Sequence, residues 1–320
     1  MIVENLRLRN LNGVDLNTVK QALECAAHVV CVCEAQRKLY APAAKSSAIY
    51  VGVPAPTQEL PPKNAMMMDA PVITFLVLGI VCPRKNQHWA VEQFKKFAGR
   101  RTDVRLVVVG ARYNRTYEIE YVEEVKGTIG NDPRIELHDA TDEVEQFYAQ
   151  ADVLLLTSLN EVTPLVLSEA MSHRIPVIST DIAGIPEMVT HGKEGYLFSP
   201  GDSDACVSYM EKLAESADLR EIMGENGKCT FDAKFDLLIM VQRYQQLIFD
   251  IAPPTLLIDM DGVLVDWDRG FYKAWVGRSH VDRSKSYYME DCVPPARRNE
   301  VLQLINTKGF FEHLPPMEGG

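Results

Sequence analysis

From residue 72 onward, apolar runs of strand length alternate with stretches whose apolar residues recur at three- and four-residue spacing. The runs are "VITFLVLG" (72–79), "VRLVVVGA" (104–111), "RIELHD" (134–139), "ADVLLLTS" (151–158) and "IPVISTD" (175–181). Continuous apolar strands are typical of a parallel sheet that helices cover on both faces. The pattern predicts an α/β fold with a Rossmann-like, doubly wound parallel sheet. Residues 202–250 are expected to add two or three helices that pack back on it.

A shorter α/β pattern precedes this domain. It predicts a helix at 18–27, a strand at 28–34, a helix at 35–41 and a strand at 46–54. These elements are too few to close a core alone. We therefore expect residues 1–54 to be the last part of another α/β layer, and residues 55–71, which contain four prolines, to be a linker.

The α/β pattern stops at "IAPPT" (251–255), and "LLIDMDGVLVD" (256–266) begins a new strand with acidic residues at its end. This change predicts a domain boundary. The expected organisation is therefore a main domain over residues 72–250 and the beginning of a further domain over residues 255–320.

Composition narrows the class of function. The chain has 320 residues, 47% of them hydrophobic and 24% charged, and a formal net charge of −11, which argues against a nucleic acid polymer as partner. No signal peptide and no apolar run long enough to span a bilayer is present, so a cytoplasmic location without a membrane span is expected. The seven cysteines form no C-x-x-C pair and are expected to be reduced thiols.

In a parallel sheet of this kind, ligands lie beyond the carboxyl ends of the strands. That rule selects residues 79–85, 110–112, 158–164 and 180–187. In the third of these segments, Thr163 is a good helix N-cap and Pro164 suits the first helical position. The helix start offers backbone N–H groups to an anion between Glu161, in the loop, and Glu169, on the helix. A nucleoside diphosphate sugar fits this arrangement. From the spacing alone, the alternative is that Glu161 is a solvated loop residue and Glu169 a surface residue of the helix.

The wider sequence context favours a ligand site. The eight-residue separation of the two glutamates, the following "EAM" and "IPVIST", and "GIPEMVTHGKEGYLFSPGD" (184–202) together resemble the C-terminal, donor-binding domain of GT-B glycosyltransferases of the retaining family four. The resemblance covers about residues 72–250. It implies transfer of a sugar from a nucleotide-sugar donor, without a divalent metal.

The resemblance also implies roles for individual residues. Lys85, in "LGIVCPRKNQ" (78–87), corresponds to the lysine that neutralises the departing diphosphate, and Glu161 to the residue that contacts hydroxyls of the transferred sugar. Glu169 corresponds to the residue that binds the ribose. Thr163 and Pro164 belong to the turn that supplies backbone donors to the diphosphate or sugar.

The sequence departs from the family pattern at two positions. Ile80 follows Gly79 where the family often has an arginine, and Val162 follows Glu161 where it often has glycine. Arg84, beside Lys85, is the candidate to contact the diphosphate in place of that arginine. Residues 1–54 resemble only the closing elements of the family's N-terminal, acceptor-binding domain, so most of the acceptor site is expected to be missing from this sequence.

A second constellation follows the domain boundary. In "LLIDMDGVLVDWDRGF" (256–271), Asp259 ends an apolar strand and Asp261 follows on a turn at Gly262. One carboxylate can attack a phosphoryl group and the other can act as general acid and base, with Mg²⁺ bound by both. A simple strand-ending turn or part of a calcium loop is the alternative.

This stretch resembles the first motif of the haloacid dehalogenase superfamily and, together with "KGFFEHLPPMEGG" (308–320), the 5'(3')-deoxyribonucleotidases. The resemblance implies Mg²⁺-dependent removal of phosphate from a nucleoside monophosphate. The family's later motifs would fall beyond the last residue, so this domain is expected to be incomplete.

The sequence is compatible with three functions. The sequence favours a glycosyltransferase donor domain joined to an incomplete nucleotidase-like domain. The alternatives are a Mg²⁺-dependent nucleotidase, and a non-catalytic nucleotide-binding fragment of a longer bifunctional protein.

Overall fold

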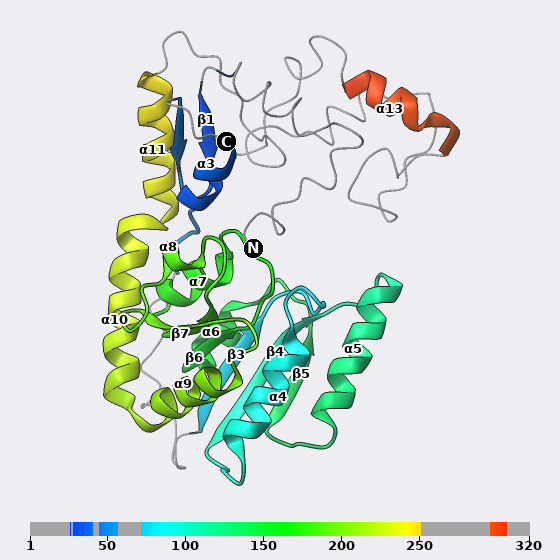
Figure 1. The fold of residues 1–320 in the computed structure, drawn as a ribbon, viewed down its shortest axis with the longest axis vertical. Helices are drawn as coiled ribbons and strands as arrows, with labels where there is room; N and C mark the ends of the chain where they lie inside the picture. Colours follow the sequence, from blue (N-terminus) through cyan, green and yellow to red (C-terminus); the bar gives the residue numbers. More distant parts are fainter. Residues whose placement is uncertain (1–25, 27, 41–44, 57–71, 251–294, 306–320) are drawn as a thin grey trace. The chain divides into compact units, whose positions relative to one another are not determined.

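The computed structural model describes residues 26, 28–40, 45–56, 72–250 and 295–305. The chain divides into two compact units, Met1–Leu256 and Leu257–Gly320. In the second unit, the described part is a 3₁₀ turn, Pro295–Arg297, followed by helix α13, Arg298–Ile305. All the other labelled elements in Figure 1 belong to the first unit.

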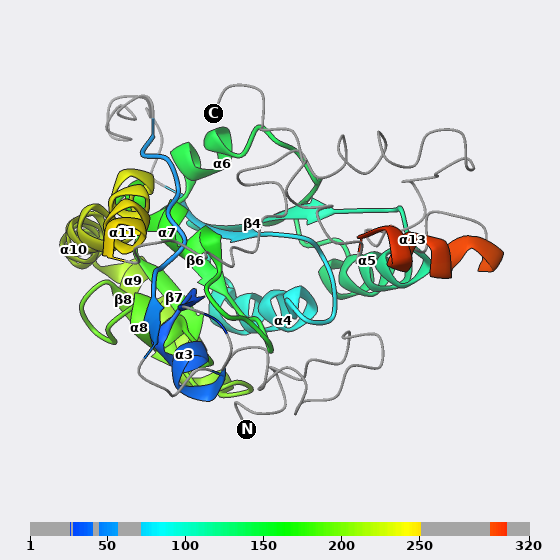
Figure 2. The same ribbon diagram turned by 90° about the horizontal axis from the view of Figure 1, so that it is seen from above.

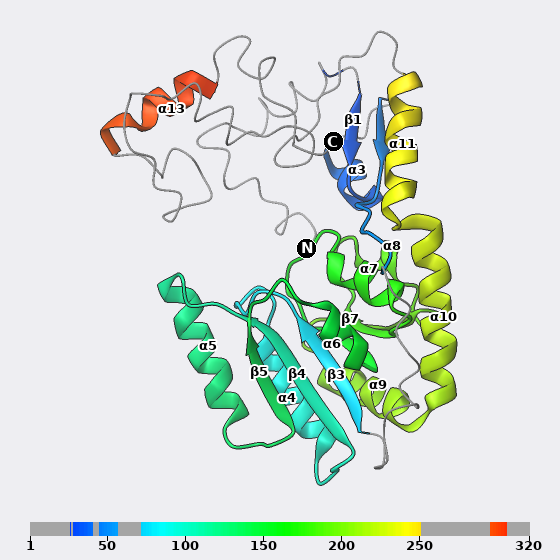
Figure 3. The ribbon, with the colours of Figure 1, turned by 180° about the vertical axis from the view of Figure 1, so that it is seen from behind.

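The first unit contains a six-stranded parallel sheet with the order β5-β4-β3-β6-β7-β8. The strands are β3 (Ile73–Leu78), β4 (Val104–Ala111), β5 (Ile135–Asp139), β6 (Val153–Leu156), β7 (Val177–Thr180) and β8 (Gly195–Phe198). Figure 3 shows β3, β4 and β5 side by side. The predicted doubly wound parallel sheet is confirmed.

Helices cover both faces of the sheet. They are α4 (Gln87–Ala98), α5 (Thr116–Ile129), α6 (Glu145–Gln150), α7 (Leu165–Ser172), α8 (Ile185–Met188), α9 (Ser203–Glu215) and α10 (Ala217–Lys234). Helix α11 (Leu237–Asp250) follows α10 but does not lie on this sheet (Figure 1), and none of its residues is buried. Viewed from above in Figure 2, the strands lie between α4 and α5 on one side and α6 and α7 on the other. The four central strands, β3, β4, β6 and β7, are therefore buried on both faces, which explains their continuous apolar sequences.

Alternate residues of each central strand enter two separate cores. In β3, Phe75 and Val77 pack with α4, α5 and α9, whereas Leu76 packs with α6, α7 and the α10 residue Phe231. This follows from the two-residue period of a strand, which directs successive side chains to opposite faces. Both cores are closely packed, and Phe75 contacts Phe97 edge to face with ring centroids 5.3 Å apart.

Two details differ from the sequence prediction. The strand β8 was not predicted, because "GYLF" is short and lies next to a glycine-containing turn. Helix α7 begins at Leu165, with Pro164 at the N-cap, so the prediction of Thr163 as N-cap was wrong by one residue. The backbone of Pro164 is extended (φ −68°, ψ 119°), a conformation that proline also adopts readily outside helices.

The N-terminal described segment contains β1 (Val29–Cys31), α3 (Glu34–Tyr40) and β2 (Ser46–Ala48). β1 and β2 pair in parallel. The Glu187 carboxylate, on α8, accepts hydrogen bonds from the amides of Glu34 (2.7 Å) and Ala35 (2.6 Å) and from the Tyr50 hydroxyl (2.8 Å). A carboxylate on the main domain thus binds the first turn of α3.

The chain order of the strands reverses between β3 and β6. The chain starts at β3, moves outward through β4 and β5, then returns to β6 and continues outward through β7 and β8. Loops that leave neighbouring strands at such a switch point run in opposite directions, and ligands of this fold bind between them. The loops after β3 and β6 are therefore expected to form the ligand-binding site.

Candidate functional site

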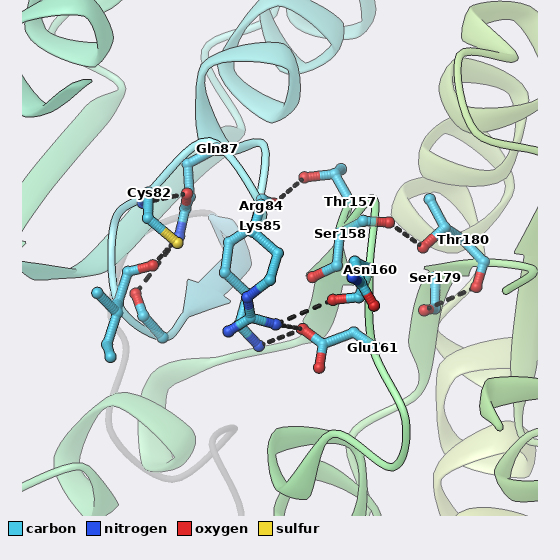
Figure 4. A network of polar contacts seen from close by, with 12 residues as sticks. Cys82, Arg84, Lys85, Gln87, Thr157, Ser158, Asn160, Glu161, Ser179 and Thr180 are labelled. Carbon is cyan, nitrogen blue, oxygen red and sulfur yellow. Dashed lines mark hydrogen bonds and ion pairs between the residues drawn. The ribbon is translucent and has the colours of Figure 1, made fainter. Parts of the chain in front are cut away.

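Lys85 and Glu161 meet at the switch point of the sheet. Lys85 comes from the loop after β3 and Glu161 from the loop after β6, and Lys85 Nζ lies 2.5 Å from Glu161 Oε1 (Figure 4). Both side chains are largely buried, with 12% and 8% of their surfaces exposed. The structure therefore brings together two residues that are 76 positions apart in the sequence and that both lie in the strand-end segments predicted to bind a ligand.

Arg84 adds a second positive charge to the same carboxylate. Its Nη1 lies 3.1 Å from Glu161 Oε1 and donates a hydrogen bond of 2.9 Å to the Asn160 carbonyl. Arg84 is 47% exposed, so it is the accessible partner and Lys85 the buried one. Two cations converge on one carboxylate oxygen. When they are not paired with Glu161, their positive charges are available to an anionic ligand at the switch point.

The loop that carries Lys85 is fixed by polar contacts from both sides. The Thr157 hydroxyl, at the end of β6, lies 3.2 Å from the Lys85 carbonyl and 3.0 Å from the Asn86 carbonyl. The Gln87 side chain donates to the Ile80 carbonyl (2.9 Å) and accepts from the Cys82 amide (3.2 Å), as Figure 4 shows. The ammonium group is therefore held in place before any ligand binds.

Gly79 has a steric role in this loop. Its amide donates to the Val109 carbonyl at 3.0 Å, so this N–H is already engaged within the sheet. Its φ is +137°, and a Cβ placed there would lie 3.6 Å from Lys85 Cε. The glycine thus permits the turn after β3 and the return of the Lys85 side chain over it.

The start of α7 presents backbone N–H groups to the same region. Pro164 has no N–H, and the Leu167 amide is bonded to the Pro164 carbonyl at 3.1 Å. The donors of this first turn are therefore the amides of Thr163, Leu165 and Val166. The preceding Val162 carbonyl contacts Gly184, where a Cβ would lie only 2.2 Å away, so the loop before α7 is packed against the loop before α8.

Glu169 lies on the second turn of α7 and is half-buried. Its Oε2 accepts a hydrogen bond of 2.6 Å from the hydroxyl of Tyr148, a side chain of α6 that is only 1% exposed. Burial, together with the negative charge of Glu169, raises the pKa of Tyr148 well above its usual value, so the phenol remains a donor. Glu169 is thus a positioned carboxylate.

Sequence reasoning missed several of these supporting residues. Asn160 lies in the selected strand-end segment, residues 158–164, and Thr157 immediately precedes it; their position at the end of β6 was the available signal. The other two lie outside the selected strand-end segments: Gln87 is the first residue of α4, and Tyr148 lies in α6, the helix before β6. Nothing in the local sequence indicates that Tyr148 contacts Glu169, because the two meet through packing on the sheet.

The predicted residues of the second constellation, Asp259 and Asp261, lie outside the described residues. Within the described part of the chain, no group of three or more His, Cys, Asp or Glu side chains is placed to hold a metal ion. Nor does any helix in that part have the length and apolar character needed to cross a membrane.

Part of the chain matches a known protein family. Residues 70–216 match the family described as "Glycosyl transferases group 1". The matched segment contains both loops of the switch point, from Gly79 to Glu161, and all of α7.

Similar sequences come from glycosyltransferases. The chain is 34% identical over 110 residues to the N-acetyl-alpha-D-glucosaminyl L-malate synthase of Bacillus anthracis, covering 34% of this chain and 29% of that protein. It is 26% identical over 172 residues to the capsular polysaccharide biosynthesis glycosyltransferase CapM of Staphylococcus aureus, covering 53% and 44%. The chain thus spans less than half the length of these relatives.

Solved structures share the fold. Anabaena HepE in complex with UDP aligns with a TM-score of 0.65 at 21% identity over 73% of this chain and 66% of that one. Sucrose-phosphate synthase from Thermosynechococcus elongatus aligns with a TM-score of 0.62 at 21% identity, over 78% and 66%. Residues 70–216 therefore resemble a glycosyl transferases group 1 domain, and the chain shares the Rossmann-like parallel-sheet fold of GT-B glycosyltransferases.

Proposed function

We propose that residues 72–250 bind a nucleotide sugar at the switch point and that the protein transfers its sugar to an acceptor. The observation that carries this proposal is the convergence of Lys85 and Arg84 on Glu161, between the loops after β3 and β6. The family match over the same loops supports it, and so does the UDP that the structural relative HepE binds.

Lys85 is assigned to the diphosphate. Breaking the bond between sugar and diphosphate leaves negative charge on the departing phosphate oxygens, and a fixed, largely buried ammonium group stabilises that charge more strongly than water does. The amides of Leu165 and Val166 and the positive end of α7 act in the same direction. Arg84, which is more exposed, is assigned to the outer phosphate oxygens.

Glu161 is assigned two successive partners. Without ligand, it neutralises Lys85 and Arg84. A bound diphosphate offers these cations a new anionic partner, and the Glu161 carboxylate then becomes an acceptor for hydroxyl groups of the sugar. Glu169, held on α7, is assigned to the ribose hydroxyls, so the two carboxylates flank the diphosphate as the sequence analysis expects.

The proposed transfer requires no divalent metal, because Lys85, Arg84 and the start of α7 supply the positive charge. We further propose that the configuration at the anomeric carbon is retained, as the resemblance to family four implies. Proton NMR of the product sugar tests the second point, and activity in the presence of EDTA tests the first.

The direct test is release of nucleoside diphosphate from UDP-, GDP- and ADP-sugars, with and without added sugar acceptors. We expect one donor to be consumed, and we expect Lys85→Met to reduce its turnover by at least about a hundredfold, a typical effect of removing a preorganised transition-state contact. Lys126→Met is the matched control, since Lys126 pairs with Glu123 on the surface of α5. Tight nucleotide binding without turnover would favour a non-catalytic binding module instead.

The Mg²⁺-dependent phosphohydrolase function proposed for residues 255–320 rests on the sequence motif alone. The family match ends at residue 216, well before Asp259 and Asp261. The prediction is tested by Mg²⁺-dependent phosphate release from nucleoside monophosphates, which Asp259→Asn must abolish if Asp259 is the nucleophile.

A further inference from the structure

The carboxylate of Glu169 is held on one side only. Oε2 accepts from the Tyr148 hydroxyl at 2.6 Å. Oε1 has no hydrogen-bond partner within the part of the chain that the structure describes. A carboxylate oxygen can accept two hydrogen bonds, so Glu169 retains acceptor capacity for a ligand with adjacent hydroxyl groups.

Tyr148 is itself fixed in place. Its side chain is 1% exposed and lies in the core that α6 forms with the sheet, α7 and α10. Its ring stacks on the His173 ring, with centroids 4.8 Å apart and planes 15° apart. His173 is anchored in turn, because its Nδ1 lies 2.8 Å from the Glu169 carbonyl oxygen and its Nε2 lies 2.7 Å from Glu145 Oε2.

These contacts form a closed frame from α6 to α7. Tyr148 approaches the side chain of Glu169, and His173 approaches its backbone carbonyl. The Glu169 carboxylate therefore cannot turn freely about its side-chain bonds without breaking a short hydrogen bond from a buried donor. A hydrogen bond to a charged group is among the stronger ones in proteins.

We propose that Tyr148 is a positioning residue, which holds Glu169 so that it accepts from the ribose hydroxyls and thereby makes the site select ribonucleotides over 2'-deoxyribonucleotides. This inference rests on the proposed function, because it assumes that a nucleotide binds at the switch point. Its physical basis is preorganisation. A carboxylate already oriented loses little freedom on binding, so each ribose hydroxyl contributes more to affinity.

The experiment is calorimetric titration of the whole chain with UDP, GDP and ADP, followed by the 2'-deoxy counterpart of the nucleotide that binds. We expect the wild type to prefer the ribonucleotide by at least about tenfold, as a hydrogen bond to a charged group allows. Tyr148→Phe keeps the stacked ring and removes the hydroxyl. The preference should then fall below about threefold, because the ribonucleotide binds more weakly while the affinity for the deoxyribonucleotide changes little.

Tyr50→Phe is the matched control. The Tyr50 hydroxyl also donates to a glutamate, Glu187, at 2.8 Å, but it lies on the N-terminal segment, so the ribose preference should stay at the wild-type value. Glu169→Gln supplies a second measurement. If Tyr148 acts through Glu169, adding Tyr148→Phe to Glu169→Gln leaves the ribose preference unchanged. A general loss of stability, which thermal unfolding measures, would not couple the two substitutions in this way.

The possible failures are distinguishable. If the wild type binds none of the three nucleotides, the proposed function fails and this inference fails with it. If the wild type binds a ribonucleotide with a clear preference over its deoxy form and Tyr148→Phe shows the same preference, only the inference is overturned.

Discussion

At the scale of single residues, the site is defined by a carboxylate with two cations. Glu161 is 8% exposed and contacts Lys85 at 2.5 Å and Arg84 at 3.1 Å. Charges this deeply buried are tolerated because they compensate one another. The same pairing prepares the site for a diphosphate, which can take over the two cations that Glu161 holds.

This pairing predicts the effect of Glu161→Gln on stability. The substitution leaves the largely buried Lys85 ammonium without its negative partner, so the free energy of unfolding of the ligand-free protein should fall by about 1–3 kcal/mol. Chemical denaturation of both proteins measures the difference. The surface pair of Glu123 and Lys126, at 2.8 Å, is the control, because Glu123→Gln should change stability by less than about 0.5 kcal/mol. Equal effects of the two substitutions would contradict this account of Glu161.

At the scale of secondary-structure elements, the position of the site depends on how closely β3 and β4 approach at their carboxyl ends. Gly110 has φ +127°, and a Cβ placed on it would lie 2.1 Å from the Gly79 carbonyl oxygen. Gly79 begins the loop that carries Lys85. Any side chain at position 110 must therefore displace the backbone of that loop.

We predict that Gly110→Ala lowers the free energy of unfolding by about 2–4 kcal/mol, since it combines a backbone clash with a φ that alanine rarely adopts. Gly127→Ala is the control. Gly127 lies within α5, and nothing is found within 4 Å of its would-be Cβ, so alanine there should stabilise the protein by about 0.5–1 kcal/mol. Denaturation midpoints compare the two variants, and similar values for both would rule out the close approach at Gly110.

A second element-level prediction concerns the joint between β8 and α10. Glu194 is only 1% exposed, and this burial raises the pKa of its carboxyl group. The carboxylate also accepts hydrogen bonds from the Thr230 hydroxyl (2.7 Å) and the Thr190 amide (2.8 Å), and Lys193 lies 2.9 Å away. These contacts outweigh the effect of burial, so the pKa of Glu194 is lowered overall. A lowered folded-state pKa stabilises the protein above the ordinary value of about 4.5, and this stability is lost as the pH falls below it.

Glu194→Gln should therefore be less stable than the wild type at pH 7, by about 1–3 kcal/mol, the range expected for hydrogen bonds to a charged group. The difference should shrink as the pH falls below about 4.5, because the wild type then loses the same charge. Denaturation series at pH 7 and at pH 3 to 4 measure it. A difference that does not change with pH would show that the ionised carboxylate is not the source of stability.

The elements themselves were largely predictable from the sequence. Strands such as β3 and β4 are buried on both faces and therefore read as continuous apolar runs. β8 escaped prediction because two of its four residues are only partly buried and a glycine begins it. Lys85 and Glu161 were found because both follow strands, whereas the contact between Tyr148 and Glu169 depends on helix packing that no local pattern encodes.

At the scale of the whole molecule, the topology explains why these residues act together. The sheet order places β3 and β6 next to each other, although 74 residues lie between Leu78 and Val153 in the sequence. Their loops therefore meet, and the amphipathic helices on both faces close the two cores beneath them. The chain spans less than half the length of the two sequence relatives described above, the Bacillus anthracis synthase and CapM.

The most direct measurement is calorimetric titration of the chain with UDP, GDP and ADP in EDTA, for the wild type and for Lys85→Met. We expect one nucleoside diphosphate to bind without metal and the substitution to weaken its binding by at least about tenfold, since it removes a charge-assisted contact to the diphosphate. Lys126→Met should bind as the wild type does. Absence of binding to all three nucleotides, or equal binding by the Lys85→Met variant, would contradict the assignment of the switch point as the donor site.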